Sequence, residues 1–281
     1  MTGGELRSIG IHPVKSTAIR PVARAEVCPW GLAGDRRWMV VDGDCVLVTA
    51  RELRELFTIT AETPDTDPQA PAGLRLSAAG HEPIDVKEPD TEAVPVRLHR
   101  HDLLARPADA GASLWLRDVL GRDDLTLMWC DDPSRRPLNP SYSRPGEHTA
   151  FADGYPATLV SLPSLARLND WIIEEALIHG EEPAPALPVE RFRPNLVVDG
   201  FEPFAEDDWT RVRVGAITFR KAKLIDRCVV TTISTTDLST AKEPIRTLAR
   251  HRQWDHQTWF GVQLIPETTG SIAVGDEVVP E

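Results

Sequence analysis

Cysteine is scarce in this chain. Its 281 residues include four cysteines, and consecutive ones are 17, 85 and 98 positions apart. No C-x-x-C pair and no tight cysteine–histidine spacing occurs, which excludes a zinc ribbon or zinc finger. Widely spaced thiols are typical of a reducing compartment rather than of a disulfide framework. The four are Cys28, Cys45, Cys130 and Cys228.

Long apolar runs and an excess of positive charge are also missing. No stretch approaches the roughly 18 apolar residues of a membrane-spanning helix, and residues 1–7 have no apolar core like that of a signal peptide. The chain carries 31 basic and 43 acidic side chains, a formal charge of −12, which disfavours binding to nucleic acid or anionic membranes. We therefore expect a soluble, cytoplasmic protein with neither nucleic acid nor membrane among its partners.

Two common catalytic signatures are absent. The sequence has no Gly-x-Ser-x-Gly nucleophile elbow and no glycine-rich phosphate loop. Proline is abundant, with 24 residues, and predicts many turns and short elements instead of long helices. A length of 281 residues with this composition favours a β-rich protein of two domains or of one large domain.

Turn signals separate short β-rich runs along the chain. Residues 37–41 and 45–49 flank Asp42-Gly-Asp44, which predicts a hairpin, and residues 94–101 are expected to form the last strand of a small N-terminal barrel or sandwich. A second hairpin is predicted over residues 211–219, around Gly215-Ala216. The proline-spaced residues 63–73 and 135–145 predict surface loops, the second of which could lie over a site.

Three short helices are expected between these strands. Apolar residues at helical spacing indicate a helix from Ala112 to Leu120, which Gly121 would end. A second helix should start at Ser161, and a third at Pro244.

Cys228 is a candidate for chemistry because of its neighbours. It follows Asp226 and Arg227 at the end of an apolar run, and a cation beside a cysteine favours the thiolate, which ligates metals or attacks electrophiles. Local context alone favours the other reading, a small core residue near a strand end, since free cysteine is among the most buried residue types.

Cationic side chains recur in three other short runs. Lys15 and Ser16 suit a phosphate by charge and by hydrogen-bond donation. Arg36 and Arg37 are neighbours of which one could point inward and the other outward. Arg191-Phe-Arg193-Pro-Asn195 offers two guanidinium groups and an amide to a flat polar ligand, although salt-bridged surface loops have the same composition.

His99 and His101 would share one strand face and could offer two metal ligands. No third Cys, His or carboxylate stands at a convincing spacing, so a metal site there is not favoured.

Seven short motifs occur along the chain: His12-Pro-Val-Lys-Ser16, Gly34-Asp-Arg-Arg-Trp38, Thr49-Ala-Arg51, Phe151-Ala-Asp153, Phe192-Arg-Pro-Asn195, Asp226-Arg-Cys228 and Val274-Gly-Asp276. Taken together in their order and spacing, they resemble those of MOSC-domain proteins such as the amidoxime-reducing components and their bacterial relatives. The resemblance implies a mainly β fold with a few short helices (α+β). It also implies an N-terminal MOSC β-barrel domain over residues 1–105, followed by a MOSC-type β-barrel domain over residues 106–281.

The resemblance implies a molybdenum cofactor, Mo-molybdopterin. It assigns Cys228 as the thiolate ligand of the metal, and Cys228 and Asp153 as the catalytic residues. The positions that match the family's cofactor-binding residues are Lys15, Ser16 and Arg36 for the phosphate, Arg193, Asn195 and Asp153 for the pterin, and Asp226 beside the metal ligand.

Reactions in this family reduce N-hydroxylated small molecules, so the resemblance implies a molybdenum-dependent oxidoreductase, independent of pyridoxal phosphate. Without a segment of clustered cysteines, electrons are expected from a separate flavin or iron–sulfur reductase. The alternative is a molybdenum cofactor or sulfur carrier without turnover. One departure concerns the rim of the site: residues 233–239 replace the Asp-Pro-x-Thr-Gly type turn that often follows the family's cysteine.

Overall fold

The computed structural model describes residues 3–281 and divides them into two compact units. The first, here called the barrel unit, comprises the chain up to Gly10, Ala23–Cys28 and Ala157–Glu281. The second, here called the two-sheet unit, comprises Ile11–Val22 and Pro29–Pro156. Each unit therefore contains segments far apart in sequence. The division into domains 1–105 and 106–281 stays a prediction.

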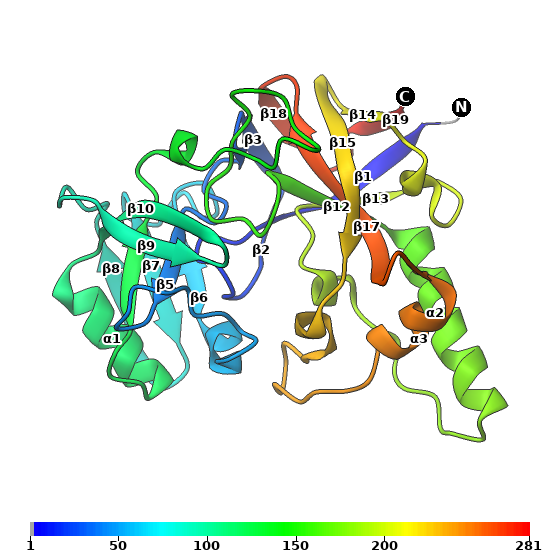
Figure 1. The fold of residues 1–281 in the computed structure, drawn as a ribbon, viewed down its shortest axis with the longest axis horizontal. Coiled ribbons are helices and arrows are strands. Elements are labelled where there is room, and N and C mark those ends of the chain that lie inside the picture. Colours follow the sequence, from blue (N-terminus) through cyan, green and yellow to red (C-terminus); the bar gives the residue numbers. More distant parts are fainter. Residues whose placement is uncertain (1–2) are drawn as a thin grey trace. The chain divides into compact units, whose positions relative to one another are not determined.

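A closed barrel forms the centre of the barrel unit. In the described residues its seven strands run in the order β12-β13-β1-β19-β14-β15-β17, and antiparallel pairing of β17 with β12 joins the two ends (Figure 1). The short strands β3 (Arg24–Cys28) and β18 (Gly270–Ala273) pair beside it, and β16 (Gln253–Trp254) pairs with β17. The barrel strands are β1 (Gly4–Ile11), β12 (Ala157–Ser161), β13 (Leu196–Asp199), β14 (Arg211–Val214), β15 (Ile217–Asp226), β17 (Gln257–Pro266) and β19 (Glu277–Pro280).

Two helices pack against this barrel. The helix α2 (Leu162–Ile178) follows Ser161, and α3 (Ile245–His251) follows Pro244, as the sequence predicts. Figure 1 shows them side by side next to β17, with which α3 is in contact. Buried Leu168 of α2 and Leu248 of α3 share one apolar cluster with Phe260 of β17. The apolar faces of both helices are therefore covered by the barrel wall.

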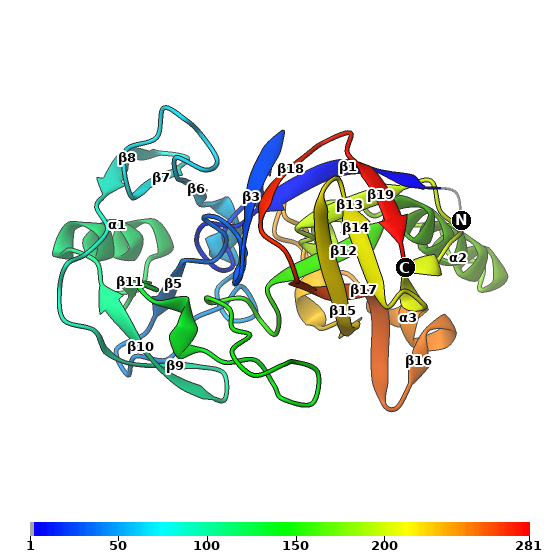
Figure 2. The ribbon, with the colours of Figure 1, turned by 90° about the horizontal axis from the view of Figure 1, so that it is seen from above.

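The two-sheet unit contains two small antiparallel sheets. One has the order β5-β11-β10-β9 and the other β6-β7-β8, and α1 (Ala110–Leu120) lies along β8 and β11 (Figure 2). Asp109 caps α1 by accepting a hydrogen bond from the Ala112 amide, and Gly121 ends it with φ +63°. The strands are β5 (Trp38–Val41), β6 (Thr60–Glu62), β7 (Leu74–Ala78), β8 (His81–Val86), β9 (Val94–Leu98), β10 (His101–Pro107) and β11 (Thr126–Trp129).

Short elements complete the chain. They are β2 (Arg20–Val22), β4 (Gly31–Leu32) and the 3-10 turns η1 (Arg54–Thr58), η2 (Pro133–Arg135), η3 (Val189–Phe192), η4 (Ala205–Asp207) and η5 (Val229–Thr232).

The predicted fold class, mainly β with a few short helices, is confirmed. The hairpin around Asp42 is confirmed by an antiparallel bridge between Val41 and Leu47, and Asp42 Oδ1 accepts from the Val46 amide. The single strand predicted over residues 94–101 is wrong. The chain turns at His99, whose φ of +54° is incompatible with a strand, so two strands pair where one was expected.

Glu206 of η4 is a fully buried carboxyl, 0% exposed, whose Oε2 accepts a hydrogen bond from Ser164 Oγ at 2.9 Å. Burial raises the pKa of Glu206 from 4.5 to about 7. With respect to this group the folded protein is most stable below about pH 4.5, and that contribution to the free energy of unfolding is lost as the pH rises through about 7. We expect Glu206→Gln to raise the free energy of unfolding at pH 8 by on the order of 2 kcal/mol, and to change it little at pH 5, in urea titrations. The exposed Glu202→Gln should change neither value; equal effects of Glu206→Gln at both pH values would contradict the expectation.

Candidate functional site

Lys15 is a buried cation in the two-sheet unit. Its amide donates to the carbonyl of Trp38 at 2.8 Å, which holds the segment after His12 against β5. The side chain is 5% exposed, and Nζ donates to the Phe151 carbonyl at 2.8 Å and to Asp153 Oδ1 at 2.6 Å. Burial lowers the pKa of Lys15 to about 8, against the opposing pull of Asp153. The ammonium is therefore still mostly charged at neutral pH.

Asp153 is the acidic partner of this cation. Its side chain is 68% exposed, in contrast to that of Lys15. The nearby Lys15 charge holds the pKa of Asp153 well below its ordinary value, and His99 Nε2 lies 3.3 Å from its Oδ1. Asp153 is thus ionised at neutral pH, where a carboxylate accepts N–H groups and has no proton to give.

Arg36 and Ser16 have unusual backbones. Both are in the left-handed region, with φ +48° and +72°, which costs a non-glycine residue about 1 kcal/mol or more and is concentrated at functional sites. The Arg36 amide donates to the His12 carbonyl at 2.7 Å, and its guanidinium donates to Asp35 Oδ2 at 2.5 Å. Asp35 also accepts from the His12 amide at 2.8 Å, so this carboxylate fixes both segments.

Arg136 is a residue that sequence reasoning missed. It lies in a run predicted to be an exposed loop, yet it is buried and donates to the carbonyls of Ala150, Ala152 and Asp153. Burial lowers its pKa to about 10. Its charge, like that of Arg36, acts on Lys15, so three cations are accompanied by two carboxylates, Asp35 and Asp153. The cluster has surplus positive charge and is suited to an anion.

His99 was considered as a metal ligand together with His101, and the structure does not support that option. His99 occupies the turn between β9 and β10, so the two residues do not share a strand face. Residues 3–281 contain no group of three or more His, Cys, Asp or Glu side chains that could hold a metal ion. The position of His99 beside Asp153 follows from tertiary contact and has no local sequence signal.

Cys228 lies at the end of β15 in the barrel unit. It is half-buried and precedes η5, where its carbonyl accepts hydrogen bonds from Thr231 N at 3.1 Å and Thr231 Oγ1 at 3.0 Å. All four cysteines are free thiols. Cys130 is buried, and burial raises its pKa to about 11, so it is a poor nucleophile or ligand. Cys228 is more accessible than Cys130.

Arg227 fixes the segment that carries Cys228 by two hydrogen bonds to backbone carbonyls. Its Nε donates to the Phe260 carbonyl at 2.7 Å and its Nη1 to the Phe192 carbonyl at 3.0 Å. These bonds connect β17 and η3 to the residue before the thiol. Arg193, which follows η3 in the left-handed region with φ +51°, is thereby held on a segment packed against that of Cys228.

Asn195 and Asp226 occupy different environments. Asn195 is fully buried; its Nδ2 donates to the Gly10 carbonyl at 3.0 Å, and its Oδ1 accepts from the Thr158 amide at 3.2 Å. Its amide therefore connects β1, β12 and β13. Asp226 is exposed, and its Oδ1 accepts from the Thr258 amide at 3.0 Å, which fixes the carboxylate two residues before Cys228.

The sequence-predicted residues thus gather separately in the two units. The two-sheet unit contains Lys15, Ser16, Arg36 and Asp153. Arg193, Asn195, Asp226 and Cys228 belong to the barrel unit.

Comparison with known proteins finds relatives that match nearly the whole chain. Mitochondrial amidoxime-reducing component 1 of Homo sapiens is 30% identical over 295 residues, which cover 98% of this chain and 82% of that protein. Mitochondrial amidoxime reducing component 2 of Rattus norvegicus is 29% identical over 296 residues, with coverage of 98% and 82%. Molybdenum cofactor sulfurase of Arabidopsis thaliana is 28% identical over 298 residues, which cover 98% of this chain but 35% of that longer protein.

These relatives contradict the cytoplasmic location expected from the sequence, because the human and rat proteins are named as mitochondrial. The expectation was wrong because a missing apolar core near residue 1 argues only against a secretory signal peptide. It does not exclude targeting to other compartments. Within residues 3–281, no helix has both the length and the apolar character needed to cross a membrane.

Two family models match successive parts of the sequence. Residues 3–123 match the MOSC N-terminal beta barrel domain, and residues 146–279 match the MOSC domain. The first match contains Lys15 and Arg36, and the second contains Asp153 and Cys228. These two matches, and 30% identity to a relative over 98% of this chain, show that the chain belongs to the family of MOSC-domain proteins that carry an N-terminal MOSC β-barrel domain.

Proposed function

We propose that this MOSC protein is a molybdenum cofactor-dependent oxidoreductase that reduces N-hydroxylated small molecules, such as amidoximes, hydroxylamines and N-hydroxylated bases. Relatives named as amidoxime-reducing components and a molybdenum cofactor sulfurase support a function related to that cofactor. The observation that carries the proposal is the buried Lys15 ammonium, which together with Arg36 and Arg136 outnumbers the carboxylates of Asp35 and Asp153. Such a surplus of fixed cations suits the phosphate of a cofactor.

The side chains present fit this group. Lys15, Ser16 and Arg36 would hold its phosphate, and the half-buried thiol of Cys228 is a ligand type suited to a soft metal. Arg193 and Asp153 would face the pterin, and Asp226 would lie beside the metal ligand. Asn195, whose amide is bonded inside the barrel, would contribute by fixing the backbone next to Arg193.

The chain's own residues have distinct tasks in such a reaction. When bound, the cofactor supplies a metal able to accept oxygen from an N–O bond while changing oxidation state. Asp153 accepts an N–H of the bound ligand, and Lys15 keeps that carboxylate ionised. Cleaving the N–O bond consumes two electrons and two protons and yields the N–H compound and water. Both protons come from solvent, and the partly exposed His99, whose Nε2 lies 3.3 Å from Asp153 Oδ1, helps to orient that carboxylate.

The electrons would come from a separate flavin or iron–sulfur reductase. A second candidate function is a carrier of the molybdenum cofactor or of sulfur without turnover. It is favoured by the similarity to molybdenum cofactor sulfurase. In that case Cys228 would carry a persulfide instead of holding a metal.

Metal analysis together with turnover tests the proposal. The full chain, purified from a host able to make the cofactor, is expected to contain close to one molybdenum and one pterin per chain, and to convert benzamidoxime to benzamidine with reduced methyl viologen as electron source. Protein from a host unable to make the cofactor serves as the control and should be inactive. Bound cofactor that passes to an apo-enzyme without turnover would instead establish the carrier, and protein without molybdenum or pterin would contradict both candidates.

A further inference from the structure

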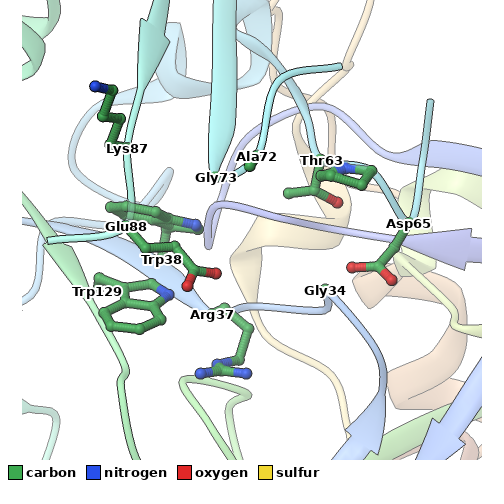
Figure 3. Close-up of a pocket in the computed structure, with 11 residues that line it drawn as sticks. Gly34, Arg37, Trp38, Thr63, Asp65, Ala72, Gly73, Lys87, Glu88 and Trp129 are labelled. Atoms are coloured by element: carbon green, nitrogen blue, oxygen red, sulfur yellow. The ribbon is translucent and has the colours of Figure 1, made fainter. Parts of the chain in front are cut away.

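A pocket of about 490 Å³ lies within the two-sheet unit and contains none of the residues assigned to the cofactor (Figure 3). Its walls come from the start of β5, the loop of residues 63–73, the chain after β8, and the end of β11. This volume lies within the range of protein sites for small molecules. A compound of one or two rings would fit inside it.

The motif that carries Arg36 also contributes the next residue, Arg37, to this pocket. Arg37 Nε and Nη2 donate to the Cys130 carbonyl at 2.9 and 2.5 Å, and the guanidinium lies 5.5 Å from the centre of the Trp129 ring. The two neighbouring arginines therefore have different partners; they lie in the turn before β5, where Arg36 has φ +48°. Because Arg37 is held by backbone carbonyls, most of its donors are unavailable to an anionic ligand.

One side of the pocket is aromatic. The rings of Trp38 and Trp129 have centroids 6.1 Å apart and are tilted by 38°. Figure 3 shows the two indoles together, on the side of the pocket away from Asp65 and Thr63. Trp38 is 1% exposed, so the flat apolar face available to a ligand is that of the half-buried Trp129, and such a face favours a planar ring.

The opposite side is a polar corner formed by Thr63 and Asp65. Thr63 is 5% exposed, and within residues 3–281 its Oγ1 has no hydrogen-bond partner. The loop is fixed by the amides of Thr66 and Asp67, which both donate to the Thr63 carbonyl at 2.9 Å. Asp65 is exposed at the mouth of the corner; partial burial of its carboxylate raises its pKa, with the charge of Arg37 opposing.

Gly34 makes this corner possible. A Cβ on residue 34 would lie 2.8 Å from Asp65 Oδ2 and 3.1 Å from Thr63 Oγ1, and the residue has φ +75°. Any other residue would therefore crowd the two oxygens and strain the backbone.

We propose that this pocket binds a planar small molecule with an amidine-type N–C–N–H edge, either an amidine or an amino-substituted nitrogen heterocycle. Its ring would lie against the half-buried Trp129, and two N–H groups would donate to the Asp65 carboxylate. Paired N–H donors match the two oxygens of a carboxylate. Four charged residues line the pocket, but Arg37 is bonded to the Cys130 carbonyl and Figure 3 shows the Lys87 ammonium pointing away from Asp65 and Glu88, so these two carboxylates disfavour an anion.

The test is a titration of the protein with three small molecules, with binding monitored by ligand-observed NMR. Benzamidine represents the amidines and 2-aminopyrimidine the heterocycles; benzoate is a ring of similar size with the opposite charge. Binding of at least one of the first two at low millimolar concentration or tighter, without binding of benzoate, is expected. The compound that binds more tightly shows whether the pocket prefers an amidine or an amino-substituted nitrogen heterocycle. No binding of either at 10 mM, or equal binding of benzoate, overturns the proposal.

Matched variants locate the binding. Asp65→Asn should weaken it about tenfold or more, whereas Asp67→Asn, the same change in the same loop but outside the pocket, should alter it less than about twofold. Thr63→Val, which keeps the side-chain shape, should weaken it several-fold and serves if Asp65→Asn does not fold. Equal affinities in all variants would overturn the assignment. Repeating the titration with Cys228→Ala separates this site from the proposed reductase, because binding here should persist when reduction is lost.

Discussion

Cys228→Ala is expected to lose the proposed reductase turnover by about a hundredfold or more while the protein remains folded. Groups that only support a metal ligand already cost about ten- to a hundredfold when removed, so loss of the ligand itself should cost at least as much. The backbone carbonyl of Cys228 accepts the hydrogen bonds from Thr231 that form the following turn, and alanine keeps those bonds. Three measurements test this expectation. Turnover of benzamidoxime reports the activity, thermal unfolding reports whether the protein is folded, and molybdenum X-ray absorption counts the sulfur atoms bound to the metal.

Cys28→Ala is the matched control for this change. Cys28 is also half-buried and lies in β3 of the same unit, so its replacement removes a comparable thiol. We expect its turnover to stay within about twofold of the wild-type value and its sulfur count to be unchanged. A Cys228→Ala variant with wild-type turnover would remove the ligand assignment. Lost turnover with an unchanged sulfur count would make Cys228 a contact of the substrate instead.

Local sequence chemistry was sufficient to predict many of the elements. Gly121 ends α1 and Pro244 precedes α3, as predicted, because caps and proline positions act within one or two turns of the chain. Gly215 permits the predicted hairpin with φ +57°. The strand over residues 94–101 failed because its turn falls at His99-Arg100, which carries no glycine, proline, asparagine or aspartate signal.

The candidate site was predictable in part, by resemblance, and its supporting residues were not. Lys15 and Cys228 stand in motifs that the family shares, whereas Arg136 lies in a proline-rich run whose composition is typical of an exposed loop. Its burial depends on three carbonyls about 15 residues further along the chain, a contact that no local pattern encodes. Asn195 shows the converse: its residue type suits a ligand contact, but its amide is bonded within the barrel.

Lys15→Met is expected to reduce the molybdenum cofactor retained by the purified protein by about tenfold or more. The change removes a buried ammonium and replaces it with an apolar chain of similar length, so the phosphate would lose its most enclosed cation. Asp153 would remain hydrated because its side chain is 68% exposed, so the fold should tolerate the loss of its partner. Molybdenum and pterin content per chain, with unfolding curves alongside, measure the effect.

The exposed Lys242→Met removes the same charge at a distant surface position and should leave cofactor content unchanged. The pH dependence separates a charge effect from loss of packing. With a pKa of about 8 against 10.5, folded Lys15 binds fewer protons than the unfolded chain between these values, so raising the pH through that range stabilises wild-type protein. The same loss of charge weakens its hold on a phosphate, so cofactor retention should fall as stability rises. Lys15→Met should show neither trend; cofactor content equal to wild type would show that Lys15 does not bind the cofactor.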